Sequence, residues 1–174
     1  MTARQRLHLF DTTLRDGAQM TGVDFSIEDK RQVALLLDKL GVSYVEGGYP
    51  GANPQDTEFF QEKRTKCARF AAFGMTRRSG RSVANDPGLA ALLDSAADTV
   101  VLVAKASEYQ VRVALETSLE DNLAAITESV GLIVAKGREA IIDCEHYFDG
   151  FKENAAYALA CAKAAHDAGA RWVV

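Results

Sequence analysis

The sequence predicts an α/β fold in which short parallel strands alternate with longer helices. Three observations support this fold class: short apolar runs recur along the chain, amphipathic runs separate them, and a glycine joins several helical runs to the next strand. The apolar runs lack the polar alternation of a half-exposed strand, which indicates burial on both faces, as in parallel sheets.

Six apolar runs are predicted to be strands because they are short and bounded by polar or glycine residues. They cover residues 7–11, 43–47, 69–74, 99–104, 140–144 and 171–174. Parallel strands require a crossover between them, and the intervening runs are long enough for helices. The pattern therefore predicts repeated strand–helix units.

The first helix is predicted from spacings of i, i+3, i+4 and i+7, which place one apolar stripe toward the sheet. The stripe consists of Val33, Leu36, Leu37 and Leu40. Ser26 and Asp29 resemble a capping box at its start, and Gly41 suits a left-handed C-terminus.

Three further helices are predicted along the chain. Asn53 and Pro54 suit the start of a helix over residues 54–66, and an alanine-rich run predicts another over 153–168. Between them, Ser118 and Asp121 open a run with a helical stripe formed by Leu119, Leu123, Ile126, Val130 and Ile133. Gly137 and Gly169 are predicted to end helices as Gly41 does.

The resulting count is about five βα units plus the start of a sixth strand. No G-x-G-x-x-G turn follows the first strand, so dinucleotide binding has no support. A complete (β/α)₈ TIM barrel needs about 250 residues. We therefore expect residues 1–174 to form the N-terminal part of a truncated barrel domain, with the remaining strands and any regulatory domain absent.

Composition excludes several classes of partner. The net charge of −4 argues against nucleic acids and anionic membranes, and no run of about 18 apolar residues is present. The N-terminus lacks the features of a secretory signal, and Cys67, Cys144 and Cys161 form no C-x-x-C pair. These features favour a cytoplasmic protein with reduced thiols.

Charged residues gather where the predicted strands end. They are Asp11, Arg15, Asp16, Glu46, Arg77, Arg78, Lys105, Asp143, Glu145 and His146. In a barrel these ends share one rim, where active sites are built. Carboxylates interspersed with cations suit a divalent metal ion holding an anionic, oxygen-rich substrate. The alternative is that charges gather there because loop ends are solvated.

Residues 11–19 have the sequence DTTLRDGAQ, which is more specific than any of its parts. It resembles the N-terminal signature of the family that contains isopropylmalate, homocitrate and citramalate synthases and hydroxymethylglutaryl-CoA lyase. Three further stretches, at 44–54, 72–78 and 145–150, narrow the resemblance to the citramalate synthase members. The H-x-H run that completes the family's metal site is absent, as are its lid and the threonine and asparagine of later strands.

The resemblance implies a metal-dependent TIM barrel and a role for each site residue. Asp16 would be a ligand of a divalent ion (Mg, Mn or Zn), and Arg15 would bind substrate and stabilise negative charge. Glu145 would take part in proton transfer, Glu46 would pair with Arg15 or orient substrate, and Gln19 would contact substrate or metal-bound water. His146 is not expected to be a ligand, because the family's metal histidines lie on a later strand.

The implied activity is that of an acyltransferase that condenses acetyl-CoA with pyruvate to give citramalate and CoA, in isoleucine biosynthesis. The partners would be a 2-oxo acid, acetyl-CoA and further copies of the chain, as a homodimer or higher oligomer. Arg77, Arg78 and Lys105 would either attract CoA phosphates or form a solvated basic loop.

Two alternatives remain open from the sequence. One is a related isopropylmalate or homocitrate synthase, or a metal-dependent carbon–carbon lyase with the same Arg–Asp pair. The other is a catalytically inactive piece that self-associates through the exposed edges of its sheet. We expect little turnover from the isolated chain, because one carboxylate without the two histidines should hold a metal weakly.

Overall fold

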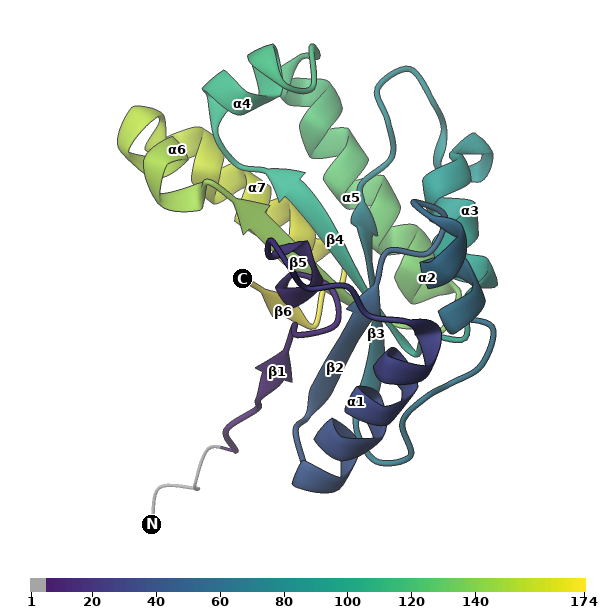
Figure 1. Cartoon of the computed structure of the whole chain (residues 1–174). Helices are drawn as coiled ribbons and strands as arrows, with labels where there is room; N and C mark the ends of the chain where they lie inside the picture. Colours follow the sequence, from purple (N-terminus) through teal and green to yellow (C-terminus); the bar gives the residue numbers. More distant parts are fainter. Residues whose placement is uncertain (1–5) are drawn as a thin grey trace.

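A computed structural model describes residues 6–174 and contains one sheet with the strand order β1-β2-β3-β4-β5-β6 (Figure 1). All neighbouring strands are parallel. The strands are β1 (Phe10–Asp11), β2 (Tyr44–Gly48), β3 (Arg69–Met75), β4 (Thr99–Lys105), β5 (Glu139–Glu145) and β6 (Trp172–Val173). The sequential order and the curvature are those of part of a (β/α) barrel, which confirms the predicted fold class.

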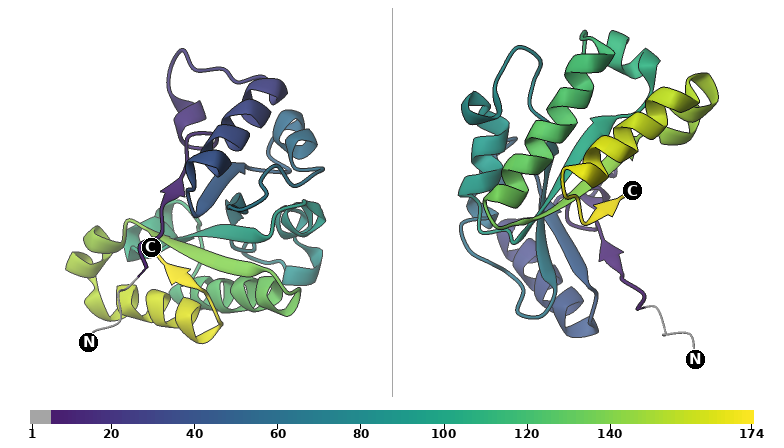
Figure 2. Two further views of the ribbon diagram at one scale, coloured as in Figure 1. Left: turned by 90° about the horizontal axis from the view of Figure 1, so that it is seen from below. Right: turned by 180° about the vertical axis from the view of Figure 1, so that it is seen from behind.

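Helices cover the convex face of the curved sheet and leave the concave face open (Figure 2). They are α1 (Ile27–Leu40), α2 (Pro54–Phe59), α3 (Pro87–Asp94), α4 (Glu108–Val113), α5 (Leu119–Ala135), α6 (Tyr147–Glu153) and α7 (Ala155–Asp167), with short 3₁₀ turns η1 (Gly17–Gln19) and η2 (Val83–Asn85). Within residues 6–174, none of these helices is both long and apolar enough to cross a membrane.

The two faces of the sheet carry separate apolar clusters. The larger cluster lies between the sheet and the helices and includes Phe59, Phe70 and Leu92. The smaller one lies on the concave face and consists of Tyr44, Ala71, Val101 and Ile141, with Phe73 and Trp172 packed against it. Because successive side chains of a strand point to opposite faces, apolar contacts on both sides explain the absence of polar alternation in the sequence.

The edge strands are shorter than predicted. The run 7–11 is a strand only at Phe10–Asp11, and the run 171–174 only at Trp172–Val173. Each of these edge strands pairs with one neighbouring strand, β2 and β5 respectively. Across the open side between these edges, the ring centroids of His8 and Trp172 lie 5.2 Å apart.

The predicted apolar stripe of α1 is half wrong. Leu36 and Leu40 are 63% and 77% exposed, while Lys30, Ala34 and Asp38 are buried. The buried polar groups have partners elsewhere in the chain, which removes the free-energy cost of burying them unpaired. The helix is therefore rotated relative to the stripe that hydrophobicity alone indicates.

Helix ends agree better with the sequence. Ser26 and Asp29 form both bonds of a capping box, and Gly41 ends α1 with a φ of +87°. The helix predicted over 54–66 ends at Phe59, and the one predicted over 153–168 begins at Ala155, after Asn154 caps it. The short helices α3, α4 and α6 were not predicted.

Candidate functional site

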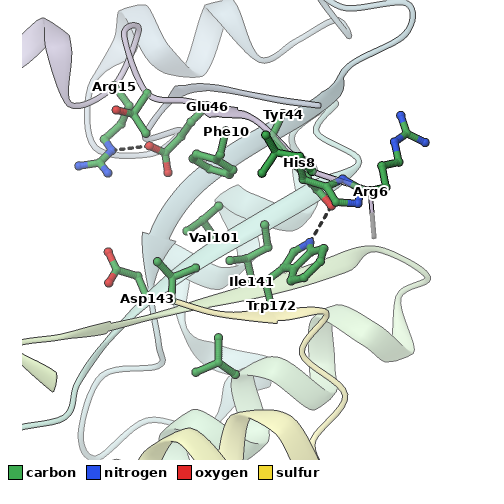
Figure 3. A pocket seen from close by; sticks show the side chains of 14 residues that line it. Arg6, His8, Phe10, Arg15, Tyr44, Glu46, Val101, Ile141, Asp143 and Trp172 are labelled. Carbon is green, nitrogen blue, oxygen red and sulfur yellow. Dashed lines mark hydrogen bonds and ion pairs between the residues drawn. The ribbon is translucent and has the colours of Figure 1, made fainter. Parts of the chain in front are cut away.

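Arg15 joins two other predicted site residues at the carboxyl end of the sheet. Its Nε donates to Glu46 Oε2 at 2.8 Å, and its Nη1 donates to Asp16 Oδ1 at 3.0 Å. Glu46 is 1% exposed, whereas the Asp16 side chain is 61% exposed. The predicted pairing of Glu46 with Arg15 is thus confirmed, and the pair is visible in Figure 3.

The loop after β1 turns sharply to present these side chains. The carbonyl oxygen of Thr12 accepts backbone N–H bonds from Arg15, Asp16 and Gly17 at 3.1, 2.9 and 3.1 Å. Leu14 is fully buried and anchors the loop to the core. The anchored turn lets Arg15 point inward while the adjacent Asp16 side chain faces solvent.

An aromatic ring supports the guanidinium of Arg15. Its Cζ lies 4.1 Å from the centroid of the Phe73 ring, which is a cation–π contact. Tyr49 in turn packs edge-on against Phe73, with the ring centroids 5.6 Å apart. A guanidinium has five N–H donors, and Glu46 and Asp16 each receive one here. The arrangement suits recognition of a further anionic oxygen.

Two carboxyl groups at this site have raised pKa values. Burial raises the pKa of Glu46, and the bond from Arg15 opposes the shift. Within residues 6–174, Glu46 Oε1 is buried and has no hydrogen-bond partner. Burial also raises the pKa of Asp143, as does the charge of Glu145, while Arg15 and Lys105 oppose it. Asp143 lies on the concave face of β5, across the hollow from Glu46 (Figure 3).

The concave face holds a cavity of about 490 Å³ with a polar end and an apolar body. Arg15, Glu46 and Asp143 lie at the polar end, and Val101 and Ile141 line the body (Figure 3). Such a cavity can hold the charged head and apolar part of a small organic acid.

A second hollow, of about 290 Å³, lies on the other side of Arg15. Gln19, Tyr49 and Asn53 are among the residues that line it. The structure therefore places Gln19 beside Arg15 but outside the concave cavity, and its predicted contact with substrate stays a prediction.

Glu145 lies further out on the rim than the other predicted residues. It forms an ion pair with Lys105, across β4 and β5, and its side chain is 42% exposed. Lys105 is the last residue of β4 and its side chain is 15% exposed, so the interpretation as part of a solvated basic loop is wrong. Its attraction of CoA phosphates stays a prediction. The role of Glu145 in proton transfer stays a prediction.

Arg77 neither lies in a solvated basic loop nor is free to bind CoA phosphates. Its side chain is 6% exposed, with Nη2 2.9 Å from Asp121 Oδ1 and Nε 2.6 Å from Glu128 Oε2. It therefore ties the end of β3 to α5 and is not available to CoA phosphates. Arg78 is exposed, and both interpretations remain open for it.

The sequence places Asp143 among the charged residues of the rim but predicts no role for it in the site. Its signal in the sequence was a carboxylate within the apolar run 140–144, two residues after Ile141, which lies on the same face. A charge at an inward position of a barrel strand is uncommon enough to mark a site.

The residues present fit one part of a divalent metal site. Asp16 is exposed, and a carboxylate oxygen is a ligand that Mg²⁺ and Mn²⁺ prefer. Within residues 6–174, no group of three or more His, Cys, Asp or Glu side chains is arranged to hold a metal ion. Ligands besides Asp16 would come from water, from substrate or from outside these residues.

The sequence of this chain is similar to those of known proteins. Residues 6–174 match the family described as HMGL-like. An (R)-citramalate synthase from Streptomyces coelicolor is 48% identical over 182 aligned residues, which cover 100% of this chain and 34% of that protein. Another, from Aquifex aeolicus, is 44% identical, with 98% of this chain and 33% of that protein covered.

A solved structure supports the fold. The HMG-CoA lyase of Bacillus subtilis superposes with a TM-score of 0.77 at 17% identity, over 97% of this chain and 57% of that one. At this identity the likeness shows the fold alone. The chain spans about a third of the length of the curated relatives it matches.

Proposed function

This chain belongs to the HMGL-like family, and on that premise we propose that it forms the N-terminal part of the catalytic domain of a citramalate synthase. The observation that carries the proposal is the 44–48% identity to (R)-citramalate synthases along nearly the whole chain. The full-length protein would join acetyl-CoA and pyruvate in the cytoplasm, for isoleucine biosynthesis.

Arg15 would bind the anionic oxygens of pyruvate at the polar end of the cavity. Its planar guanidinium offers several N–H donors in a fixed fork, which matches a carboxylate or an oxyanion. Glu46 and Phe73 hold that fork in place before substrate arrives. Such preorganisation avoids reorganisation as charge develops in the transition state.

Asp16 would hold a divalent ion together with ligands from outside residues 6–174. When bound, the ion would polarise the pyruvate carbonyl as a Lewis acid. The adjacent Arg15 then limits repulsion between the Asp16 carboxylate and an anionic substrate.

Carbon–carbon bond formation requires removal of a proton from the acetyl methyl group, and Glu145 is our candidate for that transfer. The resulting enolate attacks the carbonyl carbon of pyruvate, and Arg15 stabilises the negative charge that moves to the oxygen. Water then hydrolyses the thioester, which releases citramalate and CoA.

The experiment that tests this function is a thiol assay of CoA release by the full-length protein, with pyruvate and other 2-oxo acids compared. We expect pyruvate to be preferred over 2-oxoisovalerate by about tenfold or more in kcat/KM, because the cavity must reject the larger side chain. Preference for 2-oxoisovalerate would favour an isopropylmalate synthase. Cleavage of a hydroxyacyl-CoA without hydrolysis would favour a lyase.

A further inference from the structure

We propose that the buried ion pair between Lys30 and Asp56 is a positioning device for the Arg15–Glu46 pair. The proposal rests on the proposed function, since it assigns a role to residues behind the same site. Neither residue of the device lines the concave cavity; both line the second hollow beside Arg15. They bind the backbone at the end of β2 and directly after it, at Gly47 and Tyr49.

Lys30 extends from α1 to the end of β2. It is 4% exposed, it forms an ion pair with Asp56, and its Nζ donates to the carbonyl oxygen of Gly47 at 3.1 Å. Gly47 directly follows Glu46, so this bond fixes the peptide adjacent to the residue that holds Arg15.

Asp56, on α2, closes the turn from the other side. Its Oδ2 accepts the backbone N–H of Tyr49 at 2.9 Å and an Nδ2–H bond of Asn53 at 3.2 Å. Burying a Lys–Asp pair gains little stability by itself, because the desolvation cost offsets much of the attraction. Its contacts with the turn suggest a role in geometry.

The turn that this pair fixes is a β-bulge. Glu46 pairs with Ala71 and Gly48 with Ala72, so β2 has one extra residue at Gly47. Gly48 has a φ of +147°, and a Cβ there would lie 2.6 Å from the Asp56 carboxyl group. A bulge redirects the side chains next to it, and here the neighbouring side chain is that of Glu46.

A second path leads from the same pair to Arg15. The hydrogen bond from the backbone N–H of Tyr49 to the Asp56 carboxylate places the Tyr49 ring against Phe73. The guanidinium of Arg15 lies over the ring of Phe73. Glu46 and Arg15 are therefore both positioned by contacts that originate at Asp56.

The test compares two substitutions in the full-length protein. Asp56→Asn keeps the size of the side chain but removes the charge that holds Lys30. Asp38→Asn is the matched control, because Asp38 is also a buried carboxylate that binds a loop, through the N–H groups of Lys66, Cys67 and Ala68 at 3.0, 2.9 and 2.7 Å. That loop lies at the start of β3, at the opposite end of the sheet from Arg15.

Crystal structures and steady-state kinetics are the two measurements. We expect Asp56→Asn to displace Glu46 from Arg15 and to lower kcat by about 10- to 100-fold at little change in the KM for acetyl-CoA, since small misplacements are costly. Asp38→Asn should lower the Tm but keep both the pair and kcat. Lys30→Met should reproduce the Asp56→Asn result.

The proposal is overturned if the Arg15–Glu46 pair keeps its geometry in Asp56→Asn, or if kcat falls equally in the Asp38→Asn control. It is also overturned if neither Asp56→Asn nor Lys30→Met folds while Asp38→Asn does, because the pair would then be a stability element. If the wild-type protein forms no citramalate, the proposed function fails, and the displacement of Glu46 in the crystal structures still decides the positioning role.

Discussion

Arg15 Nε donates to Glu46 Oε2 at 2.8 Å, and this bond joins the loop after β1 to the concave face of β2. Glu46 is buried and its second oxygen, Oε1, has no partner among residues 6–174. Burying a hydrogen-bond acceptor without a partner destabilises a folded protein, so a ligand, a water molecule or another part of the protein should bind this oxygen. The unpaired Oε1 therefore marks a place beside the Arg15–Glu46 bond where a further partner is expected.

Replacing Arg15 by lysine tests whether the fork of the guanidinium matters beyond its charge. We expect Arg15→Lys to lower kcat/KM for pyruvate by about 10²- to 10³-fold, because lysine cannot bind Glu46 and substrate together in the same plane. Arg64→Lys is the control: Arg64 also lies over a ring, 5.5 Å from Phe59, and donates to a backbone carbonyl. Equal losses in both variants would argue against a substrate role.

Replacing Asp16 tests its assignment to the metal ion. Loss of a residue that only hydrogen-bonds to a metal ligand lowers metal affinity by about 10- to 100-fold. Loss of the proposed ligand itself, in Asp16→Asn, should therefore weaken Mn²⁺ binding by at least that factor. Isothermal titration of the full-length protein with Mn²⁺ measures the change independently of turnover. Asp11→Asn, at the end of β1 just before that loop, should leave the affinity unaltered, because Asp11 accepts hydrogen bonds from Thr13. Unchanged Mn²⁺ affinity in Asp16→Asn would contradict the assignment.

Asp143 gives a prediction about pH. Burial raises the pKa of Asp143, so the charged carboxylate destabilises the native state at pH values above that pKa. This destabilisation disappears as the carboxyl group becomes protonated. Asp143→Asn should therefore raise the Tm at pH 7.5, and the gain should shrink as the pH falls toward about 4.

The matched control for that experiment is Asp86→Asn. Although burial opposes it, the N–H bonds from Arg78, Leu89 and Gly88 lower the pKa of Asp86. This substitution should lower the Tm at pH 7.5, and the loss should shrink as the pH falls below about 4. A Tm change of the same sign in both variants would contradict the assigned environments.

The isolated 174-residue chain should self-associate. Its edge strands β1 and β6 each pair on one side, and the concave face is apolar. Light scattering at micromolar concentration should show dimers or larger species, and Val173→Lys, on the edge strand β6, should reduce them. Leu36→Lys, on the exposed side of α1, should not. A monodisperse wild-type monomer would refute this expectation.

Much of the fold was predictable because its signals are local. Apolar runs without alternation indicated a parallel sheet, and Ser26 and Gly41 marked the ends of α1. The Arg15–Glu46 contact was predictable, because Arg15 follows the first predicted strand, Glu46 ends the second, and both belong to one rim.

The rest depends on contacts between distant parts of the chain. Lys30 and Asp38 are buried because Asp56 and the loop before β3 satisfy them, and no periodicity indicates such partners. Likewise, Asp143 becomes a site residue only when the curvature of the sheet places it opposite Glu46. The pairing of Lys105 with Glu145 requires the register of β4 and β5.

The most direct test of the central claim is a crystal structure of the full-length protein with Mn²⁺ and pyruvate. We predict that the Asp16 carboxylate coordinates the ion and that the Arg15 guanidinium contacts an oxygen of pyruvate, with Glu46 still bound to Arg15. Pyruvate and the ion at the opposite end of the sheet, with Arg15 and Asp16 facing only solvent, would contradict the account.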